Sequence, residues 1–251
     1  DDRVRRYLEG KAGVSLCIPP AGGIAVRESP RRTAEPGNRV LAQGVAGGNG
    51  VLVTVTPGAA DAVTRALKPM APCELFSPLG RAELCRALGL SDEPRQYYLY
   101  GFEYVLTRLA DFRPAEAAPM ATPLRKVDIP PEQLALRMSE RRQTETEDFV
   151  WAFACYRDDP AFQAVELAPF GARCASIAIA IWRDGPVATF GVGTEESCRG
   201  QRYGLAAVSA VTQWVLAQGE VAVYGAYANN IPSLRIARRL GFALFHQEMG
   251  L

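Results

Sequence analysis

The chain has 251 residues, of which 48% are hydrophobic and 22% charged, and this composition excludes general disorder. The 28 basic and 27 acidic residues leave a formal charge of +1, which argues against a surface that binds nucleic acid. No apolar run approaches the ~20 residues that a membrane span needs, and the six scattered cysteines are typical of a reducing compartment. We therefore expect a cytoplasmic protein with no nucleic-acid or membrane partner; a targeting segment ahead of Asp1 stays open.

A proline-rich stretch divides the chain. Residues 113–131 contain five prolines and several alanines, and we interpret them as a linker. Ahead of it, residues 1–112 form a small α/β module with a predicted strand over 50–56, a helix over 59–71 and a tyrosine-rich strand over 96–109. The tyrosines, among them Tyr97 and Tyr98, could line a pocket, although packing within a sheet is the simpler interpretation. The module shows no chemical motif.

The second half, which we assign to a domain over 124–251, has clearer element boundaries. A mostly helical stretch is predicted over 132–163, and a β-hairpin over 174–194 with its turn at 183–185. A polar loop over 195–203 leads into a helix over 204–218, which Gly219 ends. A strand over 221–227, a short basic helix over 232–240 and a last strand from 242 complete the prediction.

The loop ahead of the predicted helix at 204 has the character of an anion site. A loop containing Gly200 and Gly204 that opens a helix points free backbone N–H groups at one spot, where the helix dipole adds positive charge. Arg199 and Arg202 add full charges, so that a phosphate or pyrophosphate is the natural ligand. The loop matches neither the P-loop pattern nor the dinucleotide fingerprint. If the loop is considered by itself, the alternative that it is only an arginine-rich turn without a ligand stays open.

Two motifs resemble the GNAT superfamily of N-acetyltransferases. Residues 199–204 (RGQRYG) resemble its acyl-CoA signature, [Q/R]-x-x-G-x-[G/A]. Asn230, Ser233 and the sequence L-G-F at 240–242 resemble its second motif. The likeness covers roughly 124–251 and is clear over 175–245. It implies an α/β (α+β) fold with a mixed sheet, in which a GNAT-like acyl-CoA-binding domain follows the smaller module. That module is either a degenerate copy of the same fold or a substrate-selecting cap.

The resemblance also implies roles for particular residues. Val192 and Gly193 would hold the pantetheine arm of CoA through their strand backbone, while Asn230 and Ser233 would bind the thioester end. Helix capping is the alternative for Asn230 and Ser233. The pyrophosphate would be bound by the loop and its backbone N–H groups: Arg199, Gly200, Gln201, Arg202, Tyr203, Gly204 and Leu205.

The sequence departs from the family pattern in three places. In the register that starts at Arg199, Arg202 replaces the first glycine of the signature, whereas a register starting at Gln201 satisfies the pattern fully; the spacing to Gly219 favours the former. Many members carry a tyrosine acid where Ala237 stands. Little chain follows Phe245 for the family's final hairpin, so the first half is expected to supply a sheet partner unless the chain is short.

The resemblance implies an acyltransferase that moves an acetyl group from acetyl-CoA to an amine of a small molecule or a protein N-terminus, by direct attack in a ternary complex. Glu195 and Glu196 are the candidate bases, with Glu166 and His246 as further candidates, and a solvated carboxylate is the alternative for each glutamate. Tyr227 is the candidate acid, and Tyr203 and Tyr224 stay open for that role by their proximity in sequence. No metal is predicted, because one histidine cannot form a histidine-rich site. Dimers are frequent in the family, so a homodimer is considered.

Two other functions remain open. A non-catalytic sensor or scaffold that binds CoA would keep the loop but lack the base and the acid. Alternatively, the N-terminal half is the working part as an interaction module, and the C-terminal domain is structural. Turnover of acetyl-CoA with an amine would separate an enzyme from the sensor.

Overall fold

The chain folds into two compact units, and neither is a single continuous stretch of sequence. The computed structural model describes residues 1–19, 22–35, 38–45, 48–90, 99–116, 119–125, 128, 130–131 and 150–251. Unit 1 comprises Asp1–Tyr104, Ala226–Ile231 and Leu244–Leu251, and unit 2 comprises Val105–Gly225 and Pro232–Ala243. The end of the chain therefore belongs with the first hundred residues.

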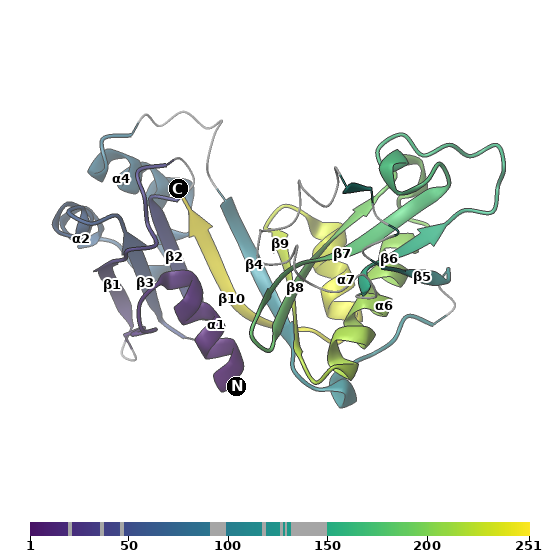
Figure 1. Cartoon of the computed structure of the whole chain (residues 1–251). Coiled ribbons are helices and arrows are strands. Elements are labelled where there is room, and N and C mark those ends of the chain that lie inside the picture. The colour runs from purple at the N-terminus through teal and green to yellow at the C-terminus, as the bar shows by residue number, and fades with distance from the viewer. Residues whose placement is uncertain are drawn as a thin grey trace. The chain divides into compact units, whose positions relative to one another are not determined.

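Unit 1 is a mixed sheet with helices on both faces (Figure 1). Its strands lie in the order β1-β3-β2-β10-β4, with β1 parallel to β3 and β2 antiparallel to both β3 and β10. The elements are α1 (Asp2–Ala12), β1 (Gly23–Glu28), β2 (Val40–Val45), β3 (Gly50–Val55), α2 (Ala60–Leu67), α3 (Pro72–Leu75), α4 (Pro78–Ala87), β4 (Leu99–Leu106) and β10 (Ala243–Gly250).

The side chains of each strand in unit 1 alternate between the two faces of the sheet, and different helices cover the two faces. Val40 and Ala42 of β2 join a buried apolar cluster with Val63 of α2 and Leu84 of α4. The intervening residues of β2 point to the opposite face, because side chains alternate along a strand. Helix α1 covers that second face, as the contacts of its buried residues with β4 and β10 show.

Unit 2 is a five-stranded sheet in the order β9-β8-β7-β6-β5. Its strands are antiparallel except for β8 and β9, which run parallel. The elements are the short 3-10 helix η1 (Leu109–Asp111), β5 (Ala121–Arg125), β6 (Val150–Tyr156), the 3-10 turn η4 (Ala168–Phe170), β7 (Cys174–Asp184), β8 (Val187–Thr194), the 3-10 turn η5 (Glu196–Cys198), α6 (Tyr203–Ala217), β9 (Val221–Tyr227) and α7 (Ile231–Arg239).

Helix α6 forms the crossover between β8 and β9. Parallel neighbours need such a connection, and α6 packs on β6, β7 and β8 in Figure 1. The apolar stripe formed by Leu205, Val208, Val211 and Val215 is buried, as are the small residues beside it. At 15 residues α6 is the longest described helix, and no described helix is both long and apolar enough to cross a membrane.

The predicted fold class, α/β with a mixed sheet, is confirmed, and the predicted elements from 174 onward lie within a few residues of their expected bounds. The helix predicted over 132–163 is wrong where it can be compared, because Val150–Tyr156 is strand β6, paired to β5 and β7. Residues 132–149, Tyr97 and Tyr98 lie outside the described residues. Strand β5 lies within the stretch predicted as a linker; the domain boundaries themselves stay a prediction.

Candidate functional site: the loop that opens helix α6

Two left-handed residues turn the chain from β8 into α6. Gly200 has φ +79°, and Arg202, the residue just before the helix, has φ +68°. Arg202 is the one non-glycine residue with positive φ in the described ranges, and this conformation costs an L-residue roughly 1–2 kcal/mol. Glycine would adopt it without that cost. Position 202 is where the acyl-CoA signature has its glycine in the register that starts at Arg199, so the backbone conformation agrees with that register.

The start of α6 presents unpaired backbone donors. The N–H of Gln201 donates to the Cys198 carbonyl over 3.4 Å, and that of Ala206 donates to the Arg202 carbonyl over 3.0 Å. No side chain caps the helix. In the described part of the chain, five other backbone N–H groups of this loop have no acceptor: those of Gly200, Arg202, Tyr203, Gly204 and Leu205. Such a group of donors, together with the positive end of the helix dipole, is suited to bind an anion.

Arg199 adds positive charge beside these donors. Its guanidinium lies 3.6 Å from Glu166 Oε2 and 3.9 Å from Glu196 Oε1, and all three side chains are more than half exposed. Exposed ion pairs of this kind contribute little to stability, because water screens them. Arg199 can therefore exchange these partners for a bound anion at small cost.

Gly204 fixes the helix start against the end of β8. A Cβ atom at this position would lie 2.9 Å from Thr194 Oγ1, closer than side chains pack. Thr194 Oγ1 is 2.9 Å from Ser176 Oγ, which in turn donates to the Gly193 carbonyl over 2.7 Å. The sequence analysis did not single out Thr194 or Ser176, because their relation to Gly204 depends on strand register.

The second half of β8 has one partner strand. Pairing with β9 runs from Val187–Val221 to Phe190–Tyr224, and in the described ranges residues 191–194 pair with β7 alone. The backbone of Val192 and Gly193 is thus open on the side away from β7. An extended ligand can form hydrogen bonds with such an edge as an added strand would.

The two candidate bases differ in their surroundings. Glu195 is 6% exposed, and its Oε2 accepts hydrogen bonds from the backbone N–H groups of Val165 (3.2 Å) and Glu166 (2.9 Å). This carboxylate therefore holds the 165–166 segment beside the loop. The side chain of Glu196 is 86% exposed and is solvated apart from its long contact with Arg199.

The remaining predicted residues follow the loop in sequence. Tyr227, which is 56% exposed, accepts a hydrogen bond at its carbonyl from the Asn230 N–H over 2.9 Å, within unit 1. Ser233 lies on α7 in unit 2, where it interacts with Tyr224. Burial raises the pKa of Tyr224, and the interaction with Ser233 opposes that rise. Ala237 is fully buried in α7.

Comparison with protein families identifies the chain. The model described as an acetyltransferase (GNAT) domain matches residues 108–243, which is more than half of the sequence. The chain therefore belongs to the GNAT acetyltransferase family, as the two sequence motifs predicted, and this family implies transfer of an acyl group from acyl-CoA. A comparison with curated proteins gives no match.

Several solved structures are similar to the chain. A GNAT-family acetyltransferase from Novosphingobium aromaticivorans has 22% identity, with 61% of this chain and 63% of that chain covered and a TM-score of 0.41. A GNAT-family acetyltransferase from Colwellia psychrerythraea has 12% identity, 79% and 75% coverage and a TM-score of 0.45. A tandem GNAT protein from the clavulanic acid biosynthesis pathway has 17% identity, 68% and 58% coverage and a TM-score of 0.37. The chain thus spans less than two thirds of the length of the first of these.

Proposed function

We propose that this protein is an N-acetyltransferase that moves the acetyl group of acetyl-CoA to an amine, on a small molecule or a protein N-terminus, within a ternary complex. The observation that carries the proposal is the start of α6, where five unpaired backbone N–H groups lie beside an exposed arginine. Family membership supports acyl transfer from acyl-CoA, and these N–H groups support the loop as the CoA-binding part of the proposal.

The CoA part of the proposal uses the loop and the adjoining strand. The pyrophosphate would accept hydrogen bonds from the N–H groups of residues 200 and 202–205, while Arg199 and Arg202 would neutralise its charge. The pantetheine arm would lie along the open edge of β8 at Val192 and Gly193. Ser233 is the proposed contact for the thioester end, together with Asn230.

The chemical step needs a base and benefits from an acid. An amine with a pKa near ~10 is protonated at neutral pH and must lose a proton before it can attack. Its nitrogen then bonds to the thioester carbonyl carbon, the carbon–sulfur bond breaks, and the thiolate takes up a proton. Strand N–H groups would polarise the carbonyl. Glu195 and Glu196 are the proposed bases, with Glu196 the more accessible, and Tyr227 is the proposed acid.

Calorimetric titration with acetyl-CoA and with CoA tests the binding half. We expect saturable binding, and a stabilisation of about 2.7 kcal/mol at 100-fold excess over Kd. The double variant Arg199→Glu/Arg202→Glu should lose binding and remain folded. Arg65→Glu/Lys68→Glu is a control with the same charge change at two exposed residues, one in α2 and one directly after it, and it should bind as wild type does. If the loop variant binds CoA with unchanged affinity, the assignment of this loop is wrong.

A second candidate function is a sensor that binds CoA without turnover. Two observations favour it. The fully buried Ala237 stands where many family members have a tyrosine that acts as general acid, and the carboxylate of the candidate base Glu195 already accepts hydrogen bonds from two backbone N–H groups. Release of free thiol from acetyl-CoA in the presence of polyamines, aminoglycosides or peptides separates the two functions. Tight binding with no thiol release for any amine class would favour the sensor.

A further inference from the structure

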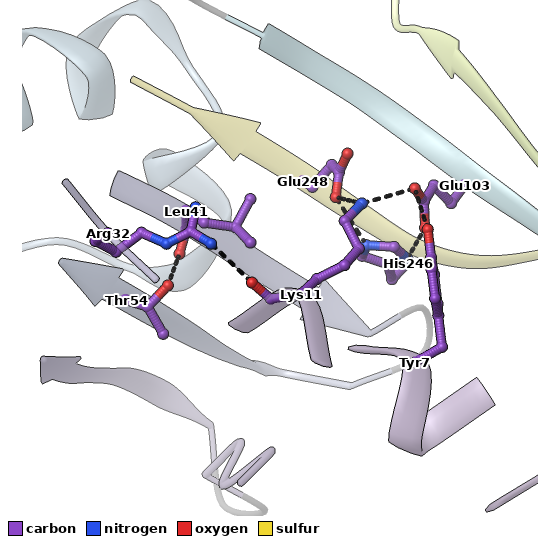
Figure 2. A network of polar contacts seen from close by, with 8 residues as sticks. All are labelled: Tyr7, Lys11, Arg32, Leu41, Thr54, Glu103, His246 and Glu248. Carbon is purple, nitrogen blue, oxygen red and sulfur yellow. Dashed lines mark hydrogen bonds and ion pairs between the residues drawn. The ribbon is translucent and has the colours of Figure 1, made fainter. Parts of the chain in front are cut away.

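Three metal-ligating side chains meet on the face of unit 1 that α1 covers (Figure 2). Glu103 comes from β4, and His246 and Glu248 come from β10. One candidate ligand atom from each lies within 4.8 Å of the other two. His246 is fully buried, with Nδ1 3.3 Å from Glu103 Oε2 and Nε2 3.3 Å from Glu248 Oε2.

The strand geometry explains why these three residues meet. His246 and Glu248 are two positions apart on β10, so both side chains point to the same face of the sheet. Strand β4 is the neighbour of β10, which brings Glu103 alongside them. The chain has a single histidine, and it lies at this point.

A cation already lies between the two carboxylates. Lys11 Nζ donates to Glu103 Oε1 over 2.8 Å and to Glu248 Oε2 over 2.5 Å. Tyr7 donates its hydroxyl to the same Glu103 oxygen over 3.3 Å. The two carboxylates of the cluster therefore already accommodate a positive charge.

Lys11 does not contact all of the possible ligand atoms of the cluster. Glu103 Oε2 and His246 Nδ1 are buried and contact each other at 3.3 Å, yet neither has a hydrogen-bond partner in the described part of the chain. The same holds for Gln43, whose side chain is fully buried and whose amide oxygen and nitrogen are both unpartnered there.

Gln43 projects from the same face of the sheet as the cluster. It lies directly opposite Glu248 in the β2–β10 register, and directly opposed residues project to the same face of a sheet. Buried amide groups normally have hydrogen-bond partners, so this one needs an explanation. A ligand held between Glu248, His246 and Glu103 would provide it, with Gln43 Oε1 as a fourth donor atom.

We propose that Glu103, His246 and Glu248, with Gln43 Oε1, form a binding site for a divalent transition-metal cation, and that Lys11 competes with the metal for it. Two carboxylates, one imidazole and one amide oxygen suit Zn²⁺, Co²⁺ or Mn²⁺. The two carboxylate charges balance a divalent ion once the lysine leaves. The side chain of Lys11 is 16% exposed, and metal binding requires its ammonium to leave both carboxylates.

The proposed metal site differs from the histidine-rich metal site that the sequence excludes. A single histidine excludes a histidine-rich centre, whereas a centre with one imidazole and two carboxylates needs only one. The proposal does not depend on the proposed acetyl transfer, because all of its residues belong to unit 1 and none belongs to the CoA loop.

The first test is titration of the tag-free protein with Co²⁺, followed by competition with Zn²⁺. The exposed thiols of Cys17 and Cys73 are replaced by serine so that they cannot bind the metal. We expect one equivalent of Co²⁺, with visible absorption typical of nitrogen and oxygen ligands and no thiolate charge-transfer band. Lys11→Met should bind at least 10-fold more tightly, because the competing ammonium is gone. Glu103→Gln should bind at least 10-fold more weakly, whereas Glu83→Gln, at a partly exposed residue of α4 that pairs with Arg86, should bind as wild type does.

The second test uses the single histidine and is independent of the stability of the ligand variants. The ¹⁵N signals of the imidazole ring in an NMR spectrum belong to His246 alone, and Zn²⁺ coordination should shift one of them strongly in Lys11→Met and in wild type. If neither protein binds Co²⁺ or Zn²⁺ at millimolar concentration, the proposal is overturned. It is equally overturned if binding leaves the His246 signals unmoved. The cluster would then be an internal ion-pair network only.

Discussion

The contact between Gly204 and Thr194 gives the sharpest test of how β8 and α6 build the CoA loop. In Gly204→Ala the added Cβ would lie 2.9 Å from Thr194 Oγ1, while the next two atoms, Ile236 Cδ1 and Ser176 Oγ, are at ordinary contact distances of 3.7 and 3.8 Å. The strain is therefore confined to one oxygen atom. Whether that oxygen can move decides the free energy of unfolding of the variant.

The hydrogen bonds of Thr194 limit this movement. Ser176 is fully buried and donates to the Gly193 carbonyl, so its oxygen accepts from Thr194 over 2.9 Å. Breaking this bond costs about 1 kcal/mol, and forcing the threonine off its rotamer costs roughly 0.5–1.5 kcal/mol. Alanine regains up to about 1 kcal/mol of helix propensity over glycine, and less at a helix start. We expect a net loss of about 1 kcal/mol in the free energy of unfolding.

A double-mutant cycle in urea, followed by far-UV circular dichroism and tryptophan fluorescence, isolates this contact. Thr194→Ala removes the obstructing oxygen, so that Gly204→Ala should be neutral or stabilising in that background. The coupling energy between the two sites should then be about 1–2 kcal/mol, as for residues in direct contact. An identical cost of Gly204→Ala in both backgrounds would refute the reasoning. Titration of the four proteins with acetyl-CoA would show whether the same contact also sets the position of the anion-binding N–H groups.

Two further predictions concern the loop backbone and the buried thiols. Arg202→Gly should raise the urea midpoint of unfolding, because the relief of roughly 1–2 kcal/mol of left-handed strain exceeds the ~0.4–1 kcal/mol by which glycine favours the unfolded chain. Arg202→Ala keeps the strain and should not raise the midpoint, so equal midpoints for the two variants would contradict this cause. At pH 8 a thiol reagent should modify Cys17 and Cys73 within minutes but Cys155 and Cys174 only after denaturation, because burial raises the pKa of the Cys155 and Cys174 thiols to about 12. Peptide mapping after a timed reaction checks this, and early labelling of Cys155 would show that β6 is not packed as described.

Local signals in the sequence were enough to predict the elements around the CoA loop. The helix at 204–218 has a stripe of apolar residues, and Gly219, with φ +73°, ends it as predicted. The strand at Val150–Tyr156 was missed because a short apolar run fits a buried strand and a buried helix equally well. Its partners β5 and β7, rather than its own residues, decide between the two.

In the candidate site, too, features that depend on neighbouring residues could be predicted, whereas contacts between residues distant in the sequence could not. The unusual residue at 202 could be recognised from the family signature, and its left-handed backbone now gives the physical reason why glycine is usual there. By contrast, the hydrogen bonds of Glu195 to residues about 30 positions earlier could not be predicted, because they depend on how the 165–166 segment returns to β8. An acidic residue beside a loop looks the same in sequence whether it is solvated or bound to the backbone.

The strand at the end of the chain has the partner that was expected from the first half of the sequence. Strand β10 pairs antiparallel with β2, and Met249 and Leu251 join the apolar cluster of unit 1, so the first half supplies the partner that the family's final hairpin would otherwise provide. On its other side β10 has β4 as its neighbour, and this brings His246 to Glu103. Of the two carboxylates beside His246, Glu248 is local in sequence but Glu103 is not, so the sequence alone does not reveal the cluster. The surroundings of His246, and with them the proposed metal site, arise from strands more than a hundred residues apart in sequence.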